Sequence, residues 1–338
     1  MTKIVLDAMG SDHYPTPDVV GAVQAAREHG VEVILVGDEA KIRPVLEAQN
    51  PGDLPLRIVH APEMLTMEDK GMALALKARR PNAKNSMAVG IDLVKNGEAD
   101  AFVTAGNTGA AMATAYFRLG TIEGVDLPAL APVFPTATGS CVVLDIGANP
   151  EVKPENLYQF AVLGSIYAEK VRGVKNPRVG LISNGEEEGK GNHNVKEATP
   201  LLKSAGLNFV GNVEGKEVIG GKVDVAVIDG FAGNIMLKTS EAVAKLIVDK
   251  IKEAIKTGGP LAMLGGLLVK PALGKIKKLL DPSEEGAAPL LGVNGLVFIG
   301  HGRSDEIAIK NAIRVAKNAA EANVLDAMRN GIRERLPR

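Results

Sequence analysis

Lys3-Ile4-Val5-Leu6-Asp7-Ala8-Met9-Gly10-Ser11-Asp12 opens the sequence with an apolar run that ends in a polar, glycine-containing turn. The run from Lys3 to Met9 predicts a strand, because strands buried on both faces are nearly continuous in apolar residues. A helix is expected from Pro17 to Glu28, with proline near its start. A strand, a polar turn and a helix in this order form the repeating unit of an α/β fold.

The same alternation continues along the chain. Further strands are expected at 31–36, 54–59, 99–104, 140–146, 178–182, 223–228 and 293–299. Further helices are expected at 85–95, 109–118, 154–171, 235–256 and the C-terminus. Strands that alternate with helices predict a mostly parallel sheet covered on both faces, a three-layer αβα fold. We expect one domain, 1–338, which two α/β lobes could make up, with the Pro-rich stretch from Pro128 to Pro135 as a crossing point.

Composition excludes several classes of protein. The formal net charge is -1, aromatic residues make up 3% and tryptophan is absent. A nucleic-acid-binding module normally shows a basic excess or stacking aromatic residues, so nucleic acid is not an expected partner. The single cysteine, Cys141, cannot form a disulfide or a zinc finger within the chain, which fits a reducing cytoplasm.

Neither a signal peptide nor a membrane span is expected. The N-terminus lacks the basic head, apolar core and cleavage site of a secretory signal. The longest suspicious stretch, from Thr257 to Val269, is uncharged for 13 residues. A spanning helix needs roughly 20.

Polar glycine-rich turns follow five of the predicted strands. They lie at 7–13, 104–110, 145–150, 183–192 and 229–234. One such turn is also what an ordinary strand-to-helix connection would use. Because ligands of open α/β sheets bind beyond the carboxyl ends of the strands, five together indicate a binding cleft.

The turn Gly106-Asn107-Thr108-Gly109 opens a helix and is the best candidate for an anion site. A helix N-terminus presents free N–H groups and a positive dipole end, which suit phosphate. The chain has neither the Walker A pattern nor a dinucleotide-binding G-x-G-x-x-G after its first strand. Classical nucleotide binding is therefore disfavoured.

The usual nucleophiles and metal ligands have little support. There is no G-x-S-x-G elbow, and Cys141 begins an apolar run typical of a buried core thiol. The five histidines are scattered without metal-ligand spacing. His13 and His301 follow predicted strands, so each either faces the cleft or caps its own loop.

Lys190 and Asn234 are the candidates for polar chemistry. Lys190 lies between Gly189 and Gly191, which lets a ligand approach the backbone and the cation closely. The alternative is a solvated loop, since Glu186 to Glu188 precede it. Asn234 either caps the long helix or polarises a carbonyl oxygen.

The segment 258–280 is predicted to be an amphipathic helix. Leu273, Ile276 and Leu280 share one face with Val269, and lysines occupy the other face. These lysines are Lys270, Lys275, Lys277 and Lys278. Such a helix suits an anionic membrane surface, and it equally suits a dimer interface.

Taken in order, the motifs resemble the bacterial phosphate acyltransferases of phospholipid synthesis. The resemblance rests on DAMG at 7–10, AGNTGA at 105–110, PALAP at 128–132, DIGAN at 145–149, KGN at 190–192, GNVE at 211–214, DGFAGN at 229–234 and HG at 301–302. It implies acyl transfer from acyl carrier protein to inorganic phosphate on a fold similar to isocitrate and isopropylmalate dehydrogenases. It also implies a homodimer, peripheral association with the inner face of the membrane, and handover of acyl phosphate to a membrane glycerol-3-phosphate acyltransferase.

The resemblance places the family's catalytic lysine and asparagine at Lys190 and Asn234. Candidates for phosphate or substrate binding are Asp7, Gly10, Asp12, His13, Gly106, Asn107, Thr108, Gly109, Asn149, Asn192, Asp229, Gly230 and His301. We expect neither a metal nor a cofactor. The acidic carrier protein should dock on a basic surface, either Lys77, Arg79, Arg80 and Lys84 or the lysines of the 270s.

Three other functions are weighed against this one. A coenzyme A-dependent phosphotransacylase would use a different thioester donor. An NAD-dependent dehydrogenase on a similar fold would need a cofactor site and metal-binding carboxylates, for which Asp224 and Asp229 are the only suggestions. A non-enzymatic membrane scaffold would explain only the segment 258–280.

Overall fold

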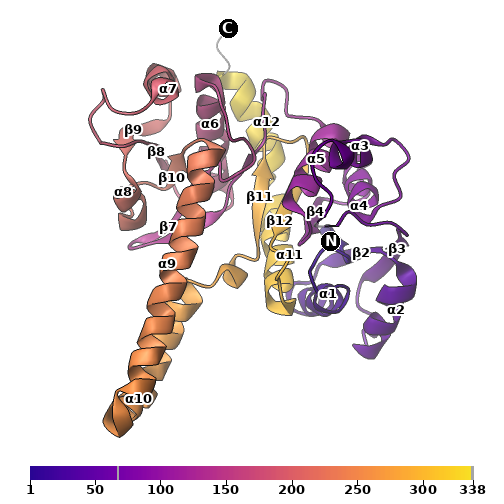
Figure 1. Cartoon of the computed structure of the whole chain (residues 1–338). Coiled ribbons are helices and arrows are strands. Elements are labelled where there is room, and N and C mark those ends of the chain that lie inside the picture. The colour runs from indigo at the N-terminus through magenta and orange to yellow at the C-terminus, as the bar shows by residue number, and fades with distance from the viewer. Residues whose placement is uncertain (67, 336–338) are drawn as a thin grey trace.

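The computed structural model describes residues 1–66 and 68–335, and the side chains of Lys275 and Lys277 also lie outside the description. The chain forms a seven-stranded sheet of order β3-β2-β1-β4-β12-β11-β5 and a five-stranded sheet of order β6-β7-β10-β8-β9 (Figure 1). Most neighbouring strands are parallel, with antiparallel pairs only at β11 with β12, β11 with β5, and β6 with β7 in this part of the chain. The predicted mostly parallel α/β architecture is confirmed.

The first sheet is buried on both faces. Its strands are β1 (Lys3–Asp7), β2 (Glu32–Gly37), β3 (Leu56–His60), β4 (Ala101–Thr104), β5 (Ala129–Leu130), β11 (Ala287–Leu291) and β12 (Leu296–Gly300). Its helices are α1 (Thr16–His29), α2 (Glu39–Ala48), α3 (Gly71–Arg79), α4 (Ser86–Lys95), α5 (Thr108–Leu119) and α11 (Glu306–Glu321). Ile4 and Leu6 join the apolar cluster that includes residues of α1 and α11, whereas Val5 joins the cluster that includes residues of α4 and α5. Alternate residues of β1 therefore point to opposite helical layers, as the period of a strand requires.

The second sheet repeats this arrangement. Its strands are β6 (Val133–Thr136), β7 (Gly139–Leu144), β8 (Arg178–Ile182), β9 (Asn208–Val213) and β10 (Val225–Val227). Its helices are α6 (Pro154–Lys170), α7 (His193–Ser204), α8 (Gly215–Gly220) and α9 (Gly230–Thr257). Val142 and Leu144 lie in the cluster with residues of α6 and α7, while Cys141 and Val143 lie in the one with Val218 of α8.

The two sheets share one core. The stretch from Pro128 to Pro135 carries the chain from β5 in the first sheet to β6 in the second. Leu6 and Leu144, from different sheets, belong to the same buried apolar cluster. The C-terminal helix α12 (Val324–Arg335) packs against α6 of the second half.

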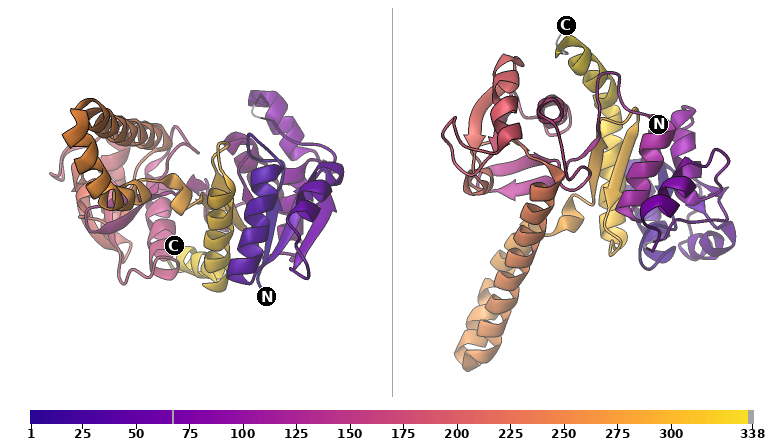
Figure 2. Two further views of the ribbon diagram at one scale, coloured as in Figure 1. Left: turned by 90° about the horizontal axis from the view of Figure 1, so that it is seen from below. Right: turned by 45° about the horizontal axis from the view of Figure 1, so that its top comes forward.

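A helical arm projects from the body. It consists of the outer part of α9 and of α10 (Gly259–Leu279), which lie side by side before the short helix η1 (Pro282–Glu284) leads back to β11 (Figures 1 and 2). The residues of α10 fall within the segment 258–280 for which an amphipathic helix is predicted. Within the described residues, no helix combines the length and apolar character needed to cross a bilayer.

Several elements differ from the sequence expectations. The long helix begins at Gly230 rather than Ile235, because Asp229 caps it. Strand β11 was not predicted, since Pro289 lies within it and proline is rare in strands. Helix α7 was not predicted either, and it contains Pro200.

Candidate active site

The turns that follow β1 and β4 lie against each other, because these two strands are parallel neighbours. Gly10 is the point of closest approach. A Cβ at this position would lie 2.9 Å from both the Gly106 amide nitrogen and Thr104 Oγ1. The absence of a side chain at Gly10 therefore allows the two turns to pack together.

Asp7, at the end of β1, links these two turns through hydrogen bonds. Its side chain is 1% exposed and accepts a hydrogen bond from Thr104 Oγ1 at 2.8 Å. Thr104 Oγ1 in turn accepts the Gly106 amide at 3.0 Å. Burial raises the pKa of Asp7, against the opposing effect of its hydrogen bonds. Asp7 and Gly106, which are expected to bind ligand, thus form hydrogen bonds that support the turn.

At the start of α5, the Asn107 side chain caps the helix and contacts a neighbouring loop. The Asn107 side chain accepts from Ala110 N at 3.0 Å and donates to the carbonyls of Thr66 and Asp69 at 3.0 and 3.1 Å. Its amide is thus engaged in capping and in holding the 66–69 loop. Thr108 and Gly109 are exposed at the helix start, where N–H groups suit an anion.

Long helix α9 reaches from the second sheet to loops of the first. Glu241 of α9 lies 3.8 Å from His301 Nε2 and 3.9 Å from Arg303. Burial lowers the pKa of His301. The amide of Asp12 donates to Gly302 O at 2.6 Å, so the turn after β1 lies beside this junction, with His13 exposed next to it.

Asp145, at the end of β7, holds the turn that receives α9. Its carboxylate accepts the amides of Leu130, Ala148 and Asn149 at 3.1, 3.1 and 2.6 Å. The Asn149 side chain donates to Asp145 at 3.0 Å and to Pro128 O at 2.7 Å. Burial raises the pKa of Asp145. The side-chain amide of Asn149, a residue expected to bind substrate, thus links this turn to Pro128.

The first turn of α9 lies directly on the Asp145 turn. The Gly230 amide donates to Asn149 O at 2.9 Å. A Cβ at Gly233 would lie 1.9 Å from Asp145 O, and one at Gly230 would lie 2.7 Å from the Asp145 carboxylate. Only glycine fits at these two positions without displacing the backbone.

This docking leaves the Asn234 side chain exposed. Asp229 caps α9 by accepting from Ala232 N at 2.8 Å, so the alternative that Asn234 is the cap is wrong. Asn234 is exposed, its side chain lies beside Gly147, and it makes no side-chain hydrogen bond within the described residues.

Lys190 lies on the exposed loop between β8 and α7. The neighbouring Glu186 pairs with Lys216 and Lys222, while Glu188 pairs with Lys203. Lys190 forms no ion pair with any described residue. Glu186 and Glu188 thus pair with cations other than Lys190, while Glu187 forms no ion pair with a described residue.

A hollow of about 460 Å³ lies between the start of α7, which follows the Lys190 loop, and the first turn of α9. It is lined by Pro150, Glu151, Val152, Asn192, Asn194, Asp229 and Phe231. Asn192 caps α7 by accepting from Val195 N at 3.0 Å, and it stands two residues after Lys190. Phe231 is 64% exposed and stands three residues before Asn234.

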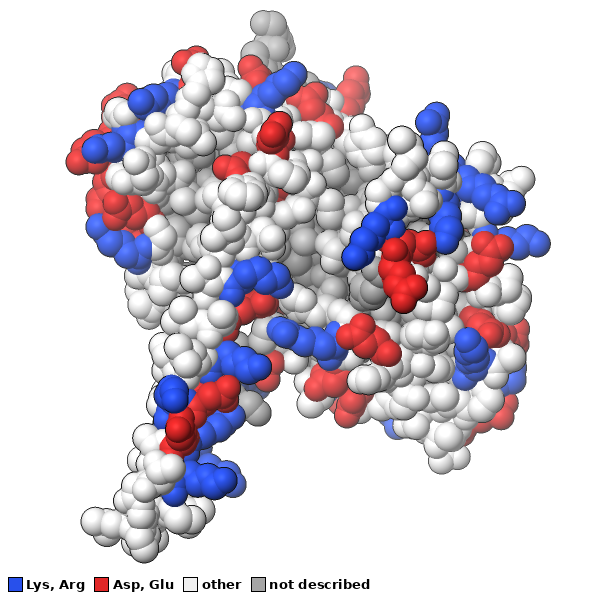
Figure 3. Space-filling view, in the orientation of Figure 1, with Lys and Arg blue, Asp and Glu red and all other residues white. Residues whose placement is uncertain are grey.

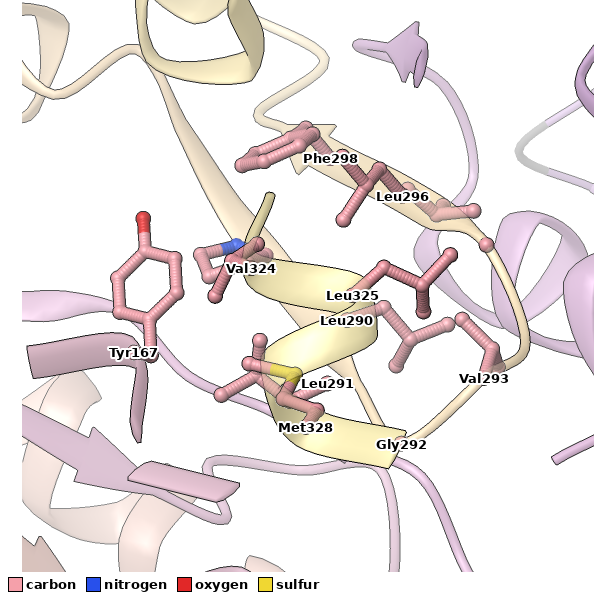
Figure 4. A pocket seen from close by; sticks show the side chains of 13 residues that line it. Tyr167, Leu290, Leu291, Gly292, Val293, Leu296, Phe298, Val324, Leu325 and Met328 are labelled. Atoms are coloured by element: carbon pink, nitrogen blue, oxygen red, sulfur yellow. The ribbon is translucent and has the colours of Figure 1, made fainter. Parts of the chain in front are cut away.

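A second cavity, between β11, β12 and α12, is not a substrate site. Its volume is about 10 Å³, and side chains such as Tyr167, Leu291 and Met328 enclose it (Figure 4). A space of this size is near the limit for one water molecule.

The residues that a dehydrogenase or a cysteine nucleophile would use have other surroundings in this structure. Asp224 forms a two-pronged ion pair with Arg178, at 2.9 Å for each oxygen, which lowers the pKa of Asp224. No group of three or more His, Cys, Asp or Glu side chains among the described residues could hold a metal ion. Cys141 is fully buried, and burial raises the pKa of its thiol to about 12, as a core position predicts.

Three organising residues were absent from the predicted site: Thr104, Asp145 and Asn212. Asp145 and Asn212 stand inside motifs that carried the family resemblance, so their positions were visible. Their roles were not, because each acts through hydrogen bonds to distant backbone groups.

Comparison with known proteins identifies the family of this chain. A family model described as "Fatty acid synthesis protein" matches residues 2–327. The "Phosphate acyltransferase" of Acidobacterium capsulatum is 50% identical over 325 residues, which cover 96% of this chain and 95% of that protein. The chain belongs to this family.

Members of the family share a wider fold with other enzymes. A phosphotransacetylase from Streptococcus pyogenes matches with a TM-score of 0.61 at 17% identity, covering 95% of this chain and 94% of that one. A 4-hydroxythreonine-4-phosphate dehydrogenase from Klebsiella pneumoniae matches with a TM-score of 0.53 at 14% identity, covering 93% and 99%. These likenesses show the fold alone, and they agree with the dehydrogenase-like architecture that the resemblance implies.

Gly233→Ala should destabilise the protein and disturb Asn234. The added methyl group would overlap the Asp145 carbonyl, and relief requires α9 to move away from the turn. We expect the free energy of unfolding, measured by urea titration, to fall by about 1–3 kcal/mol or more.

Gly265→Ala is the matched control. It also places alanine in a helix, but apart from its chain neighbours and the backbone of its own helix, no atom of the described residues lies within 4 Å of the new Cβ. Unchanged or slightly increased stability is expected there, because alanine favours helix by about 1 kcal/mol over glycine. Equal stability of the two variants would contradict the docking role of Gly233.

Proposed function

We propose that this chain transfers a long-chain fatty acyl group from acyl carrier protein to inorganic phosphate, giving acyl phosphate for phospholipid synthesis. The chain is an acyltransferase of lipid biosynthesis, and phosphate is its substrate. The observation that carries the site assignment is the hollow between the loop of Lys190 and the first turn of α9. Two of its lining residues are close in sequence to the candidates: Asn192 stands two residues after Lys190, and Phe231 stands three residues before Asn234. Among the described residues, Lys190 forms no ion pair and the Asn234 side chain forms no hydrogen bond, so both are open to substrate.

The reaction needs no covalent enzyme intermediate. A thioester is already activated, so a phosphate oxygen can attack its carbonyl carbon directly. The new C–O bond forms as the carbonyl oxygen takes up negative charge, and collapse of this intermediate breaks the C–S bond and releases the carrier thiolate. The site must therefore stabilise a phosphate and a developing oxyanion together.

The residues divide these tasks. Lys190 holds phosphate or stabilises the oxyanion, since its ammonium has no ion-pair partner among the described residues. Asn234 orients and polarises the thioester carbonyl with its side-chain amide. The exposed start of α5 at Thr108 and Gly109 contributes N–H groups for phosphate.

The donor docks on a surface around α3. Met72 and Leu76 are 79% and 65% exposed there, and Arg79, Arg80 and Lys84 are exposed beside them. Figure 3 shows Lys and Arg side chains gathered over this part of the molecule. An apolar patch ringed by cations suits the acidic carrier protein. Asn107 ties the preceding 66–69 loop to the start of α5, which links this surface to the site.

The arm serves both self-association and membrane contact. Leu261, Leu267 and Leu268 of α10 are 83%, 66% and 77% exposed. Val243, Leu246 and Ile247 of α9 are half exposed along the same projection. A soluble monomer rarely leaves so many apolar side chains together on its surface. We assign the α9 face to a second copy of the chain and the α10 tip, flanked by Lys270, to an anionic lipid surface.

Peripheral attachment to the inner face of the membrane also suits the product. Acyl phosphate carries a long apolar tail and would be handed to a membrane glycerol-3-phosphate acyltransferase without crossing the bulk solvent.

Lys190→Ala should lower kcat by about a hundredfold to a thousandfold, the usual effect of removing one donor that stabilises a transition-state anion. Acyl phosphate is measured as its hydroxamate with saturating acyl carrier protein donor and phosphate. Lys196→Ala, which removes an exposed lysine of α7, should leave turnover unchanged. Near-normal turnover of Lys190→Ala would sink the assignment.

Arg79→Glu with Arg80→Glu should raise the KM for the acyl carrier protein donor about tenfold while kcat is retained, and the difference should shrink in high salt. Lys170→Glu with Lys175→Glu makes the same charge change at exposed positions of the other half. Equal effects of the two pairs would indicate a general charge effect and exclude a dock at α3.

Leu261→Glu with Leu268→Glu should abolish sedimentation with vesicles that contain anionic lipid and leave the molecular mass in solution unchanged. Met72→Glu with Leu76→Glu, on exposed residues of α3, should sediment normally. If the arm variant instead becomes monomeric and still binds vesicles, the α10 tip belongs to the interface between copies.

A further inference from the structure

The loop that carries Lys190 has little backbone stiffness of its own. Gly185, Gly189 and Gly191 interrupt it, and glycine gives the unbound chain many conformations. Residues 186–190 are all exposed, so no core packing holds the loop in place. Its geometry must come from hydrogen bonds.

Asn212 supplies the main clamp. Its side-chain nitrogen donates to Glu187 O at 3.0 Å and to Lys190 O at 3.4 Å. The Lys190 amide also donates to Glu187 O at 2.9 Å, which closes a tight turn. One amide group thus grips both ends of the turn that presents Lys190.

The clamp stands on a rigid base. Asn212 is the second-last residue of β9, it is paired with Leu181 of β8, and it is 5% exposed. The loop leaves β8 just beyond this pair, so clamp and loop share one pair of strands. On the far side of Lys190, Asn184 Oδ1 accepts the Gly191 amide at 2.9 Å.

The oxygen of the Asn212 side-chain amide does not hold the loop. It is buried and finds no hydrogen-bond partner among the described residues. Buried polar atoms without partners are rare, and each needs an explanation. Burial of the Asn212 oxygen without a partner is unfavourable, while the nitrogen of the same amide holds the loop through its two hydrogen bonds.

We infer that Asn212 is the positioning residue for Lys190: its buried amide fixes the turn so that the ammonium faces the phosphate and the developing oxyanion. This inference rests on the proposed catalytic role of Lys190. The motif Gly211-Asn212-Val213-Glu214 thereby acquires a function through the loop rather than through contact with substrate.

The test is a double-mutant cycle on kcat with acyl carrier protein donor and phosphate. Asn212→Ala should lower kcat about tenfold to a hundredfold, the scale of a small misplacement of a catalytic group. In the Lys190→Ala background, Asn212→Ala should cause no further loss, because it acts only through Lys190. Asn212→Ser, whose hydroxyl is too short to reach both carbonyls, should behave like the alanine variant.

Asn208→Ala is the matched control for a purely structural loss. Asn208 stands on the same strand and donates a similar bond to Asn176 O at 3.0 Å, on a loop away from Lys190. It should lower the melting temperature comparably and leave kcat unchanged.

The outcomes separate two failures. If Lys190→Ala keeps its turnover, the proposed role of Lys190 fails. If Lys190→Ala is inactive but Asn212→Ala is fully active, or its loss multiplies that of Lys190→Ala, the positioning role of Asn212 is overturned. Hydrogen exchange of the wild-type enzyme needs no variant: slow exchange at the Lys190 and Gly191 amides is expected, and exchange at the rate of a free loop contradicts the clamp.

Discussion

The buried carboxylate of Asp145 is the constraint on which the site depends. It accepts three backbone amides and one side-chain amide, so the turn after β7 has one conformation. The glycines at the start of α9 then seat that helix on the turn, with no room for a side chain. Because α9 is straight and long, this contact sets the position of Asn234, the junction with His301 and the direction of the arm.

The fold was predictable where strands are buried on both faces, because such strands are continuous runs of apolar residues. Continuous apolar strands followed by polar turns identified β1, β2, β4, β7 and β8 to within a few residues. Some elements that contain proline or are very short were not predicted. Pro289 obscured β11, Pro200 lies inside α7, and β5 has only two residues. The division into two sheets depends on pairings between residues far apart in sequence, which local patterns do not encode.

The site was predictable as a set of turns but not as a set of roles. Asp7, Gly106 and Asn149 have the residue types of ligand contacts, and the sequence does not reveal that they also support the turns through hydrogen bonds to Thr104 and Asp145. Lys190 and Asn234 are both exposed, and their catalytic roles remain a prediction from the resemblance. Asn212 acts across two strands, so only the folded backbone reveals it.

The most direct measurement is acyl phosphate formation by the purified wild-type protein from inorganic phosphate and palmitoyl-acyl carrier protein, with palmitoyl-coenzyme A in parallel. We expect phosphate-dependent product from the carrier-protein donor and little from coenzyme A. Product from coenzyme A alone would contradict the assigned donor, and no product from either thioester would contradict the proposed reaction.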